Sequence, residues 1–145
     1  MKKIIVILFL AFVSNSYAQE PGEKLFKAVF NNDLKAVKSI INKDASLVNY
    51  VRKINEVFYI PVLMQSVMNN QTDIAKFLIV KGADVNAQDG LKMTCLMWAA
   101  NNENIELVKL LLEKGADKSV KDNQGMTALQ AAEKTKNLKV IELLK

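Results

Sequence analysis

The sequence contains no histidine and only one cysteine among its 145 residues. Without histidine, Ser-His-Asp and Cys-His catalysis and histidine-ligated metal sites are excluded. A lone cysteine excludes an internal disulfide framework and every multi-cysteine zinc motif. Glycine and proline are scarce, at five and two residues, which excludes collagen-like and low-complexity disordered chains. No glycine-rich phosphate loop or G-x-S-x-G motif occurs either, so we expect no catalytic residue, no cofactor and no metal.

The first eighteen residues have the pattern of a secretory signal peptide. Two lysines precede an unbroken apolar run, Ile4–Val13, and small side chains at Ser16 and Ala18 suit cleavage before Gln19. As a helix this run rises only about 15 Å, against the ~30 Å of a bilayer core. The sequence therefore predicts a signal peptide over 1–18, export by a Sec-type route and a periplasmic or secreted mature chain without stable membrane insertion.

The charge pattern argues against a nucleic-acid partner. Without the two leader lysines, 18 basic and 15 acidic side chains remain, and the lysines are scattered among the acids. Arg52 is the only arginine. Proteins that bind nucleic acids gather lysine and arginine on one face, so we expect no nucleic-acid partner.

The rest of the chain repeats at a step of 33 residues. Residues 93–99 align with 126–132, and the segment Lys-Gly-Ala-Asp at 81–84 recurs at 114–117. Two short apolar segments at 94–101 and 105–114 read as helices, with Thr94 as N-cap and Gly115 as a left-handed C-cap. Helices this short, and apolar on most sides, need neighbours in front and behind. Such a period indicates stacked repeats.

At this point the chain resembles the ankyrin repeat family. Residues 82–87, Gly-Ala-Asp-Val-Asn-Ala, match the family's G-A-D-V-N-A ending, and 94–100 and 122–127 match other parts of its motif. The resemblance implies an all-α ankyrin-repeat solenoid of about four helix-turn-helix repeats with hairpin-like connecting loops. It places repeats at about 24–46, 58–87, 88–120 and 121–145 of a domain spanning 19–145. The first is degenerate, and the family's histidine positions hold Phe26, Met64, Met97 and Gln130.

Two residues of the third repeat, Lys92 and Cys95, carry separate expectations. Lys92 takes the place of the turn glycine in the third repeat, and Gly90 lies two residues earlier, so we expect that turn to differ in detail. Cys95 begins a helix in a packed position, which favours a small buried hydrophobic side chain over a reactive thiol.

Five extra residues interrupt the period between Asp44 and Pro61. Runs of β-branched and aromatic residues at 47–51 and 57–60 flank a polar middle, which favours a β-hairpin. We therefore expect a lengthened loop, called the finger below, over about 47–60. Its aromatic residues, Tyr50, Phe58 and Tyr59, either contact a partner or fill a gap over the weak first repeat.

The resemblance implies a binding surface on the concave side of the stack. Trp98 occupies a variable position that faces this groove in the family, so it is either a contact hot spot or packed against the next repeat. Apolar side chains along the groove and loop tips would together mark an interface. The predicted partner-binding residues are Tyr50, Arg52, Phe58, Tyr59, Gln65, Met68, Leu91, Met93, Trp98, Asn101 and Met126.

We expect a non-catalytic monomer that binds another protein outside the cytoplasm through the concave face and the finger. We expect it to act on a periplasmic protein, either as an immunity-type inhibitor or as a stabiliser. The alternative is a secreted effector that binds a host protein. Two other classes remain open. An enzyme would need a carboxylate- or lysine-based site, for which no constellation is visible. An envelope element would need an anchor, which the sequence lacks.

Overall fold

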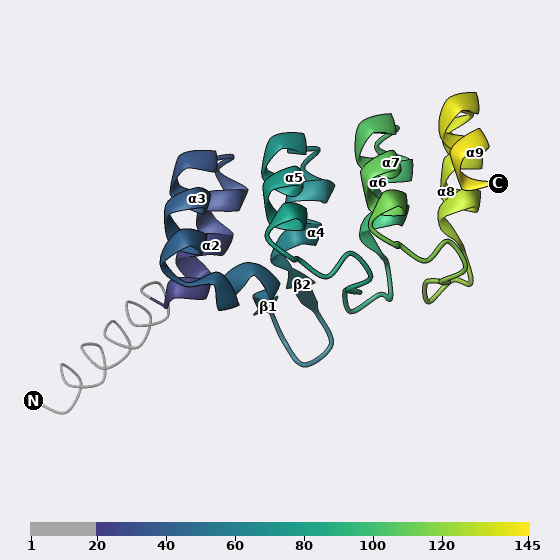
Figure 1. The fold of residues 1–145 in the computed structure, drawn as a ribbon. Helices are drawn as coiled ribbons and strands as arrows, with labels where there is room; N and C mark the ends of the chain where they lie inside the picture. The colour runs from purple at the N-terminus through teal and green to yellow at the C-terminus, as the bar shows by residue number, and fades with distance from the viewer. Residues whose placement is uncertain (1–19) are drawn as a thin grey trace, which may run out of the picture.

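A computed structural model describes residues 20–145, so the predicted signal peptide at 1–18 lies outside the described residues. Within this range the chain forms four antiparallel helix pairs that stand side by side in a row (Figure 1). The first pair begins at Pro21, three residues earlier than expected. In chain order the pairs are α2 (Pro21–Phe30) and α3 (Leu34–Lys43), α4 (Val62–Met68) and α5 (Thr72–Val80), α6 (Cys95–Asn101) and α7 (Ile105–Glu113), and α8 (Ala128–Thr135) and α9 (Leu138–Leu144).

Five helices, α3, α6, α7, α8 and α9, begin at a side chain that caps them. Thr94 accepts a hydrogen bond from the Met97 backbone N–H at 3.3 Å, as predicted for the start of α6. In the last pair, Thr127 and Gln130 form a reciprocal capping box. Gln130, which holds a family histidine position, therefore stabilises the start of α8 by accepting a hydrogen bond from the Thr127 N–H. Gly115 ends α7 with φ +84°, the predicted left-handed conformation.

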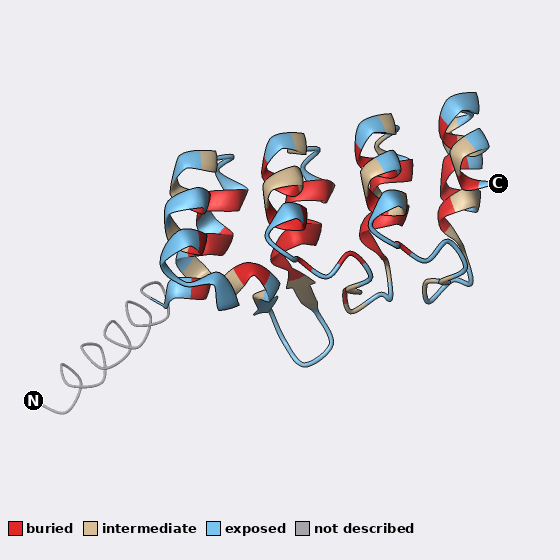
Figure 2. Ribbon diagram, viewed as in Figure 1, coloured by how far each residue is buried: buried red, intermediate tan, exposed pale blue. Residues whose placement is uncertain are grey.

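The pairs form two layers. The first helices, α2, α4, α6 and α8, contact one another in order, and so do the second helices, α3, α5, α7 and α9. Figure 2 shows buried residues on the sides that face neighbouring helices and exposed residues on the outer turns. Leu25, Leu63 and Leu96 hold equivalent positions in three pairs and are at most 2% exposed. The stacked repeats and the all-α fold class are therefore confirmed.

Polar side chains link neighbouring pairs on two sides of the row, the side of the long loops and the side of the short turns within the pairs. On the loop side, Asn49 accepts a hydrogen bond from the Asp84 N–H and Asn86 accepts one from the Asp117 N–H, both at 2.8 Å. On the opposite side, Asn104 donates to the Thr72 hydroxyl at 2.8 Å. These contacts help to fix the register between neighbouring repeats, in addition to the hydrophobic packing of the helices.

No helix within residues 20–145 combines the length and the apolar character needed to cross a membrane.

Candidate functional site

The finger is a β-hairpin that projects from the row of helices between the first two pairs (Figure 1). Strand β1 (Val51–Lys53) pairs antiparallel with β2 (Tyr59–Pro61), so the hairpin prediction is confirmed. The Asn55 side chain closes the turn by accepting hydrogen bonds from the N–H groups of Val57 (2.9 Å) and Phe58 (2.7 Å). The β-branched and aromatic run 47–51 suggested that the first strand begins at residue 47. Residues 47–49 instead belong to a 3₁₀ helix, η1 (Ala45–Asn49), and the strand begins at Val51.

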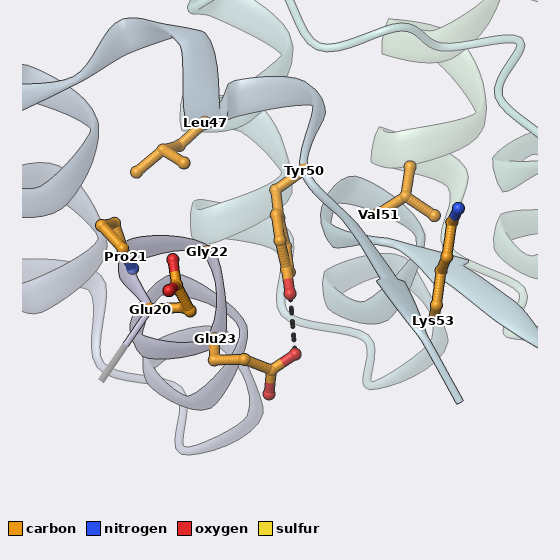
Figure 3. Close-up of a pocket in the computed structure, with 8 residues that line it drawn as sticks. All are labelled: Glu20, Pro21, Gly22, Glu23, Leu47, Tyr50, Val51 and Lys53. Atoms are coloured by element: carbon orange, nitrogen blue, oxygen red, sulfur yellow. Dashed lines mark hydrogen bonds between the residues drawn. The ribbon is translucent and has the colours of Figure 1, made fainter. Parts of the chain in front are cut away.

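Tyr50 anchors the finger to the first helix. Its hydroxyl donates to Oε1 of Glu23 at 2.7 Å, which Figure 3 shows beside an open hollow of about 540 Å³. The ring lies against Gly22, where a Cβ atom would come within 2.0 Å of it. Burial, followed by the hydrogen bond and charge of Glu23, raises the pKa of Tyr50 to about 12. This predicted contact residue therefore has a packing role, one of the two alternatives that the sequence left open.

Arg52 completes the anchor on the other side of Glu23. Its Nε lies 3.3 Å from Oε2 of that carboxylate, and its guanidinium lies 4.9 Å from the centre of the Phe26 ring. Both oxygens of Glu23 are thus engaged, one by Tyr50 and the other by Arg52. Glu23 is therefore the shared partner of two finger residues.

The base of the finger also touches the loop that precedes α6. The Gly90 N–H donates to the Tyr59 carbonyl at 3.4 Å, and a Cβ atom at Gly90 would lie 1.9 Å from the Val57 carbonyl oxygen. Glycine is therefore required here for close approach of two backbones. Lys92 itself adopts the left-handed conformation, with φ +60°, so the expectation that this turn differs was wrong: the turn keeps its shape without glycine.

Exposed apolar side chains gather at the finger tip and on this neighbouring loop. Phe58 and Leu91, both predicted, are 45% and 43% exposed. Ile54 and Val57 are 59% and 62% exposed, and neither was among the predicted contact residues. Ile54 carried a signal in the sequence, because an apolar residue in the polar middle of a hairpin has little structural reason to be there. Val57 carried none, because it begins the run 57–60 that was expected to form the second strand. We call Ile54, Val57, Phe58 and Leu91 the finger patch.

The predicted residues on the first helices are less accessible than the groove hypothesis required. Gln65 is only 7% exposed, so it offers little surface to a partner. Met68 and Trp98 are half-buried and pack against the core. The Trp98 indole N–H is buried and has no hydrogen-bond partner among the described residues. Asn101 is exposed, as predicted.

The remaining predicted residues lie on the finger and the loops. Tyr59, Met93 and Met126 are half-buried. The Met126 sulfur accepts a hydrogen bond from the Lys134 ammonium at 3.0 Å. The structure thus brings Phe58, Tyr59, Leu91 and Met93 together through the contact between finger and loop, and leaves Met126 one repeat further along. That these residues bind a partner stays a prediction.

A second hollow, of about 300 Å³, lies where the finger faces helix α2. Phe30, which is 64% exposed, forms part of its wall. Phe30 holds a variable repeat position but was not among the predicted contact residues. The hollow is lined by Glu23, Phe26, Lys27, Phe30 and Arg52.

The comparison with known families agrees with this architecture. A family model described as ankyrin repeats in three copies matches residues 63–145, more than half of the 145-residue chain. No curated protein matches the sequence. The matched range holds the last three helix pairs, and the degenerate pair α2–α3 stacks on them in the same orientation. The chain belongs to the ankyrin repeat family.

Proposed function

We propose that this protein is a non-catalytic binding module that acts outside the cytoplasm and holds a protein partner against its finger and concave face. Ankyrin repeats generally serve as protein–protein interaction modules, and the family is typically non-catalytic. The partner is a protein of the same compartment, which the module inhibits or stabilises. Export rests on the leader pattern at residues 1–18, and a chain isolated outside the cytoplasm is expected to begin at Gln19.

The observation that carries the proposal is the finger patch. Four large apolar side chains stay exposed on two neighbouring loops, whereas other exposed apolar residues, such as Val80 and Leu138, lie on separate helices. Contiguous exposed apolar surface usually marks an interface. The patch is also held in place, because Tyr50 and Gly90 fasten the finger on both sides.

A fixed patch loses little conformational entropy when a partner docks on it. Binding costs free energy wherever loops and side chains must be ordered, and pre-organised surfaces avoid part of that cost. The repeats behind the finger contribute a rigid frame, since each pair is packed against its neighbours. Glu23, which lines both hollows beside the finger, is already engaged by Tyr50 and Arg52.

Affinity capture with the chain from Gln19 onward, applied to the extracytoplasmic fraction and followed by mass spectrometry, tests this function. Phe58→Ser combined with Leu91→Ser is expected to abolish capture of the partner. The matched control is Val80→Ser combined with Leu138→Ser, two residues that are 72% and 79% exposed on α5 and α9, away from the finger. Equal loss in both double variants, or no specific capture by the parent chain, would refute the proposal. The captured protein's own activity with and without the module then separates inhibition from stabilisation.

A further inference from the structure

The side chains of the concave face indicate the chemistry of the partner. We infer that the face binds an extended protein segment with an apolar centre and carboxylates at both ends; this inference rests on the proposed function. It concerns eight residues, two from each first helix at equivalent repeat positions, which we call the inner strip. They are Lys27, Phe30, Gln65, Met68, Trp98, Asn101, Ala131 and Lys134.

The centre of the inner strip is uncharged. Met68 and Trp98 are half-buried, and Asn101 is exposed beside them. Half-buried methionine and tryptophan present apolar surface to whatever covers them, and tryptophan is enriched among interface hot spots. This middle section fits apolar side chains.

Both ends of the inner strip are cationic. Lys27 and Lys134 are exposed and lie in the last turns of α2 and α8. No acidic residue occurs among the eight positions. Among the second helices, α5, α7 and α9 carry both signs, and Lys76 of α5 pairs with Glu106 of α7, whereas α3 carries lysines alone. Within the inner strip, positive charge thus stands at the two ends and no acidic position balances it, which favours a partner with negative charge at matching places.

The N-terminal end offers a shaped site as well as a charge. Lys27 borders the 300 Å³ hollow together with the rings of Phe26 and Phe30. Arg52 is satisfied there by Glu23, whereas Lys27 forms no ion pair with any residue in 20–145. An apolar side chain next to a carboxylate would fill the aromatic part of the hollow and pair with the free ammonium.

At the C-terminal end, the Lys134 ammonium is held over Met126. Its hydrogen bond of 3.0 Å goes to a thioether sulfur, which is a weak acceptor. A carboxylate would replace that contact with a charge-assisted hydrogen bond, roughly twice as strong as a neutral one. The ammonium is therefore positioned for a carboxylate but not yet paired with one.

The spacing of the two lysines sets the length of the bound segment. Neighbouring packed helices lie about 9 Å apart, so three steps from α2 to α8 cover about 27 Å. An extended chain advances about 3.3 Å per residue and crosses that distance with about eight residues. The two acidic ends of the partner segment are thus expected about eight positions apart.

Peptide display tests this inference and requires no identified partner. Two libraries of peptides about ten residues long share a randomised apolar centre and carry either aspartate pairs or lysine pairs at both ends. The full chain from Gln19 is expected to enrich the aspartate library. Lys27→Gln with Lys134→Gln should weaken the selected peptides about tenfold, as two exposed ion pairs are lost, in fluorescence anisotropy with labelled peptide. Lys27→Glu with Lys134→Glu should switch the preference to the lysine library.

The matched control is Lys35→Gln with Lys139→Gln, exposed lysines on α3 and α9 of the same two repeats, which should leave affinity within about twofold. The inference is overturned if neither library is enriched, if end charge makes no difference, or if the control weakens binding equally. The inference is also overturned if a captured protein binds the Lys27→Gln, Lys134→Gln double variant as tightly as the parent chain. In that case the proposed protein-binding function would still hold. Circular dichroism of each variant separates misfolding from loss of contact.

Discussion

The hydroxyl of Tyr50 donates a hydrogen bond of 2.7 Å to Glu23, which joins the finger to the first helix across 27 positions of sequence. Burial, and then the hydrogen bond and charge of Glu23, raise the pKa of this phenol from 10.0 to about 12. The folded state therefore favours the protonated phenol, and its contribution to stability is complete below pH 10.0 and lost as the pH rises toward about 12.

Substitution Tyr50→Phe is expected to remove this part of the alkaline destabilisation. Urea unfolding at several pH values should show the parent chain losing more stability than Tyr50→Phe between pH 10 and about 12. At neutral pH the same variant should cost about 0.5–1.5 kcal/mol for the missing hydrogen bond. The difference in absorbance at 295 nm between the two proteins gives the phenol's midpoint directly. A midpoint near that of free tyrosine would contradict the anchor.

The substitution Leu111→Ala tests the phase of the repeats. Leu111 is fully buried in the second-helix layer, so its truncation should cost about 2–5 kcal/mol in the free energy of unfolding. Leu138→Ala is the control, since Leu138 is 79% exposed and should change stability by less than about 0.5 kcal/mol. Chemical denaturation measures both. A cost below about 1 kcal/mol for Leu111→Ala would be incompatible with its place in the core.

Lys92→Gly is expected to stabilise the protein. Lys92 holds φ +60° at the position where the next repeat has Gly125, with φ +78°. Left-handed conformation strains a residue with a Cβ atom, so glycine should gain about 0.5–1 kcal/mol after its larger loss of chain entropy. Gly125→Ala, the reciprocal change, should destabilise by a similar amount. The melting temperatures of both variants, measured by thermal unfolding, test this prediction. A lower melting temperature for Lys92→Gly would contradict the left-handed conformation of Lys92.

Cys95 is expected to be unreactive in the folded protein. It is buried at the start of α6, and burial, with smaller effects from Asp84 and Asp89, raises the pKa of its thiol to about 12. Because the thiolate is the nucleophile, labelling with a thiol reagent near pH 8 should be slow under native conditions and rapid in urea. Rapid native labelling would show that the first turn of α6 opens readily.

The repeat architecture was predictable because it depends on features that recur along the chain. Equivalent leucines at 63 and 96, and the left-handed glycines at 82 and 115, are separated by the same step, so each repeat supports the interpretation of the others. The finger was predictable because an insertion disturbs that step, and β-branched residues flank it.

Two of the details that were missed depend on contacts between distant residues, and a third depends on a local turn. Gly22 looks like an ordinary residue near a helix start, and only the packed Tyr50 ring explains why no side chain fits there. Gln65 looks like a surface residue by type, but neighbouring helices leave it 7% exposed. Lys92 keeps a glycine-like conformation because Asp89 accepts hydrogen bonds from the N–H groups of Leu91 and Met93 and closes the turn. The contacts of Gly22 and Gln65 have no local sequence signature, whereas the aspartate turn at Asp89 is local and could have been predicted.

The row arrangement has a mechanical consequence. Helices α8 and α9 pack against a single neighbouring pair, whereas the first pair is tied both to its neighbour and to the finger through Tyr50 and Arg52. In linear stacks of this kind, resistance to opening is a sum of nearest-neighbour terms. Under tension applied to the two ends of the row, separating the first pair from the second therefore requires the contacts of Tyr50 and Arg52 with Glu23 to break in addition to the helix packing.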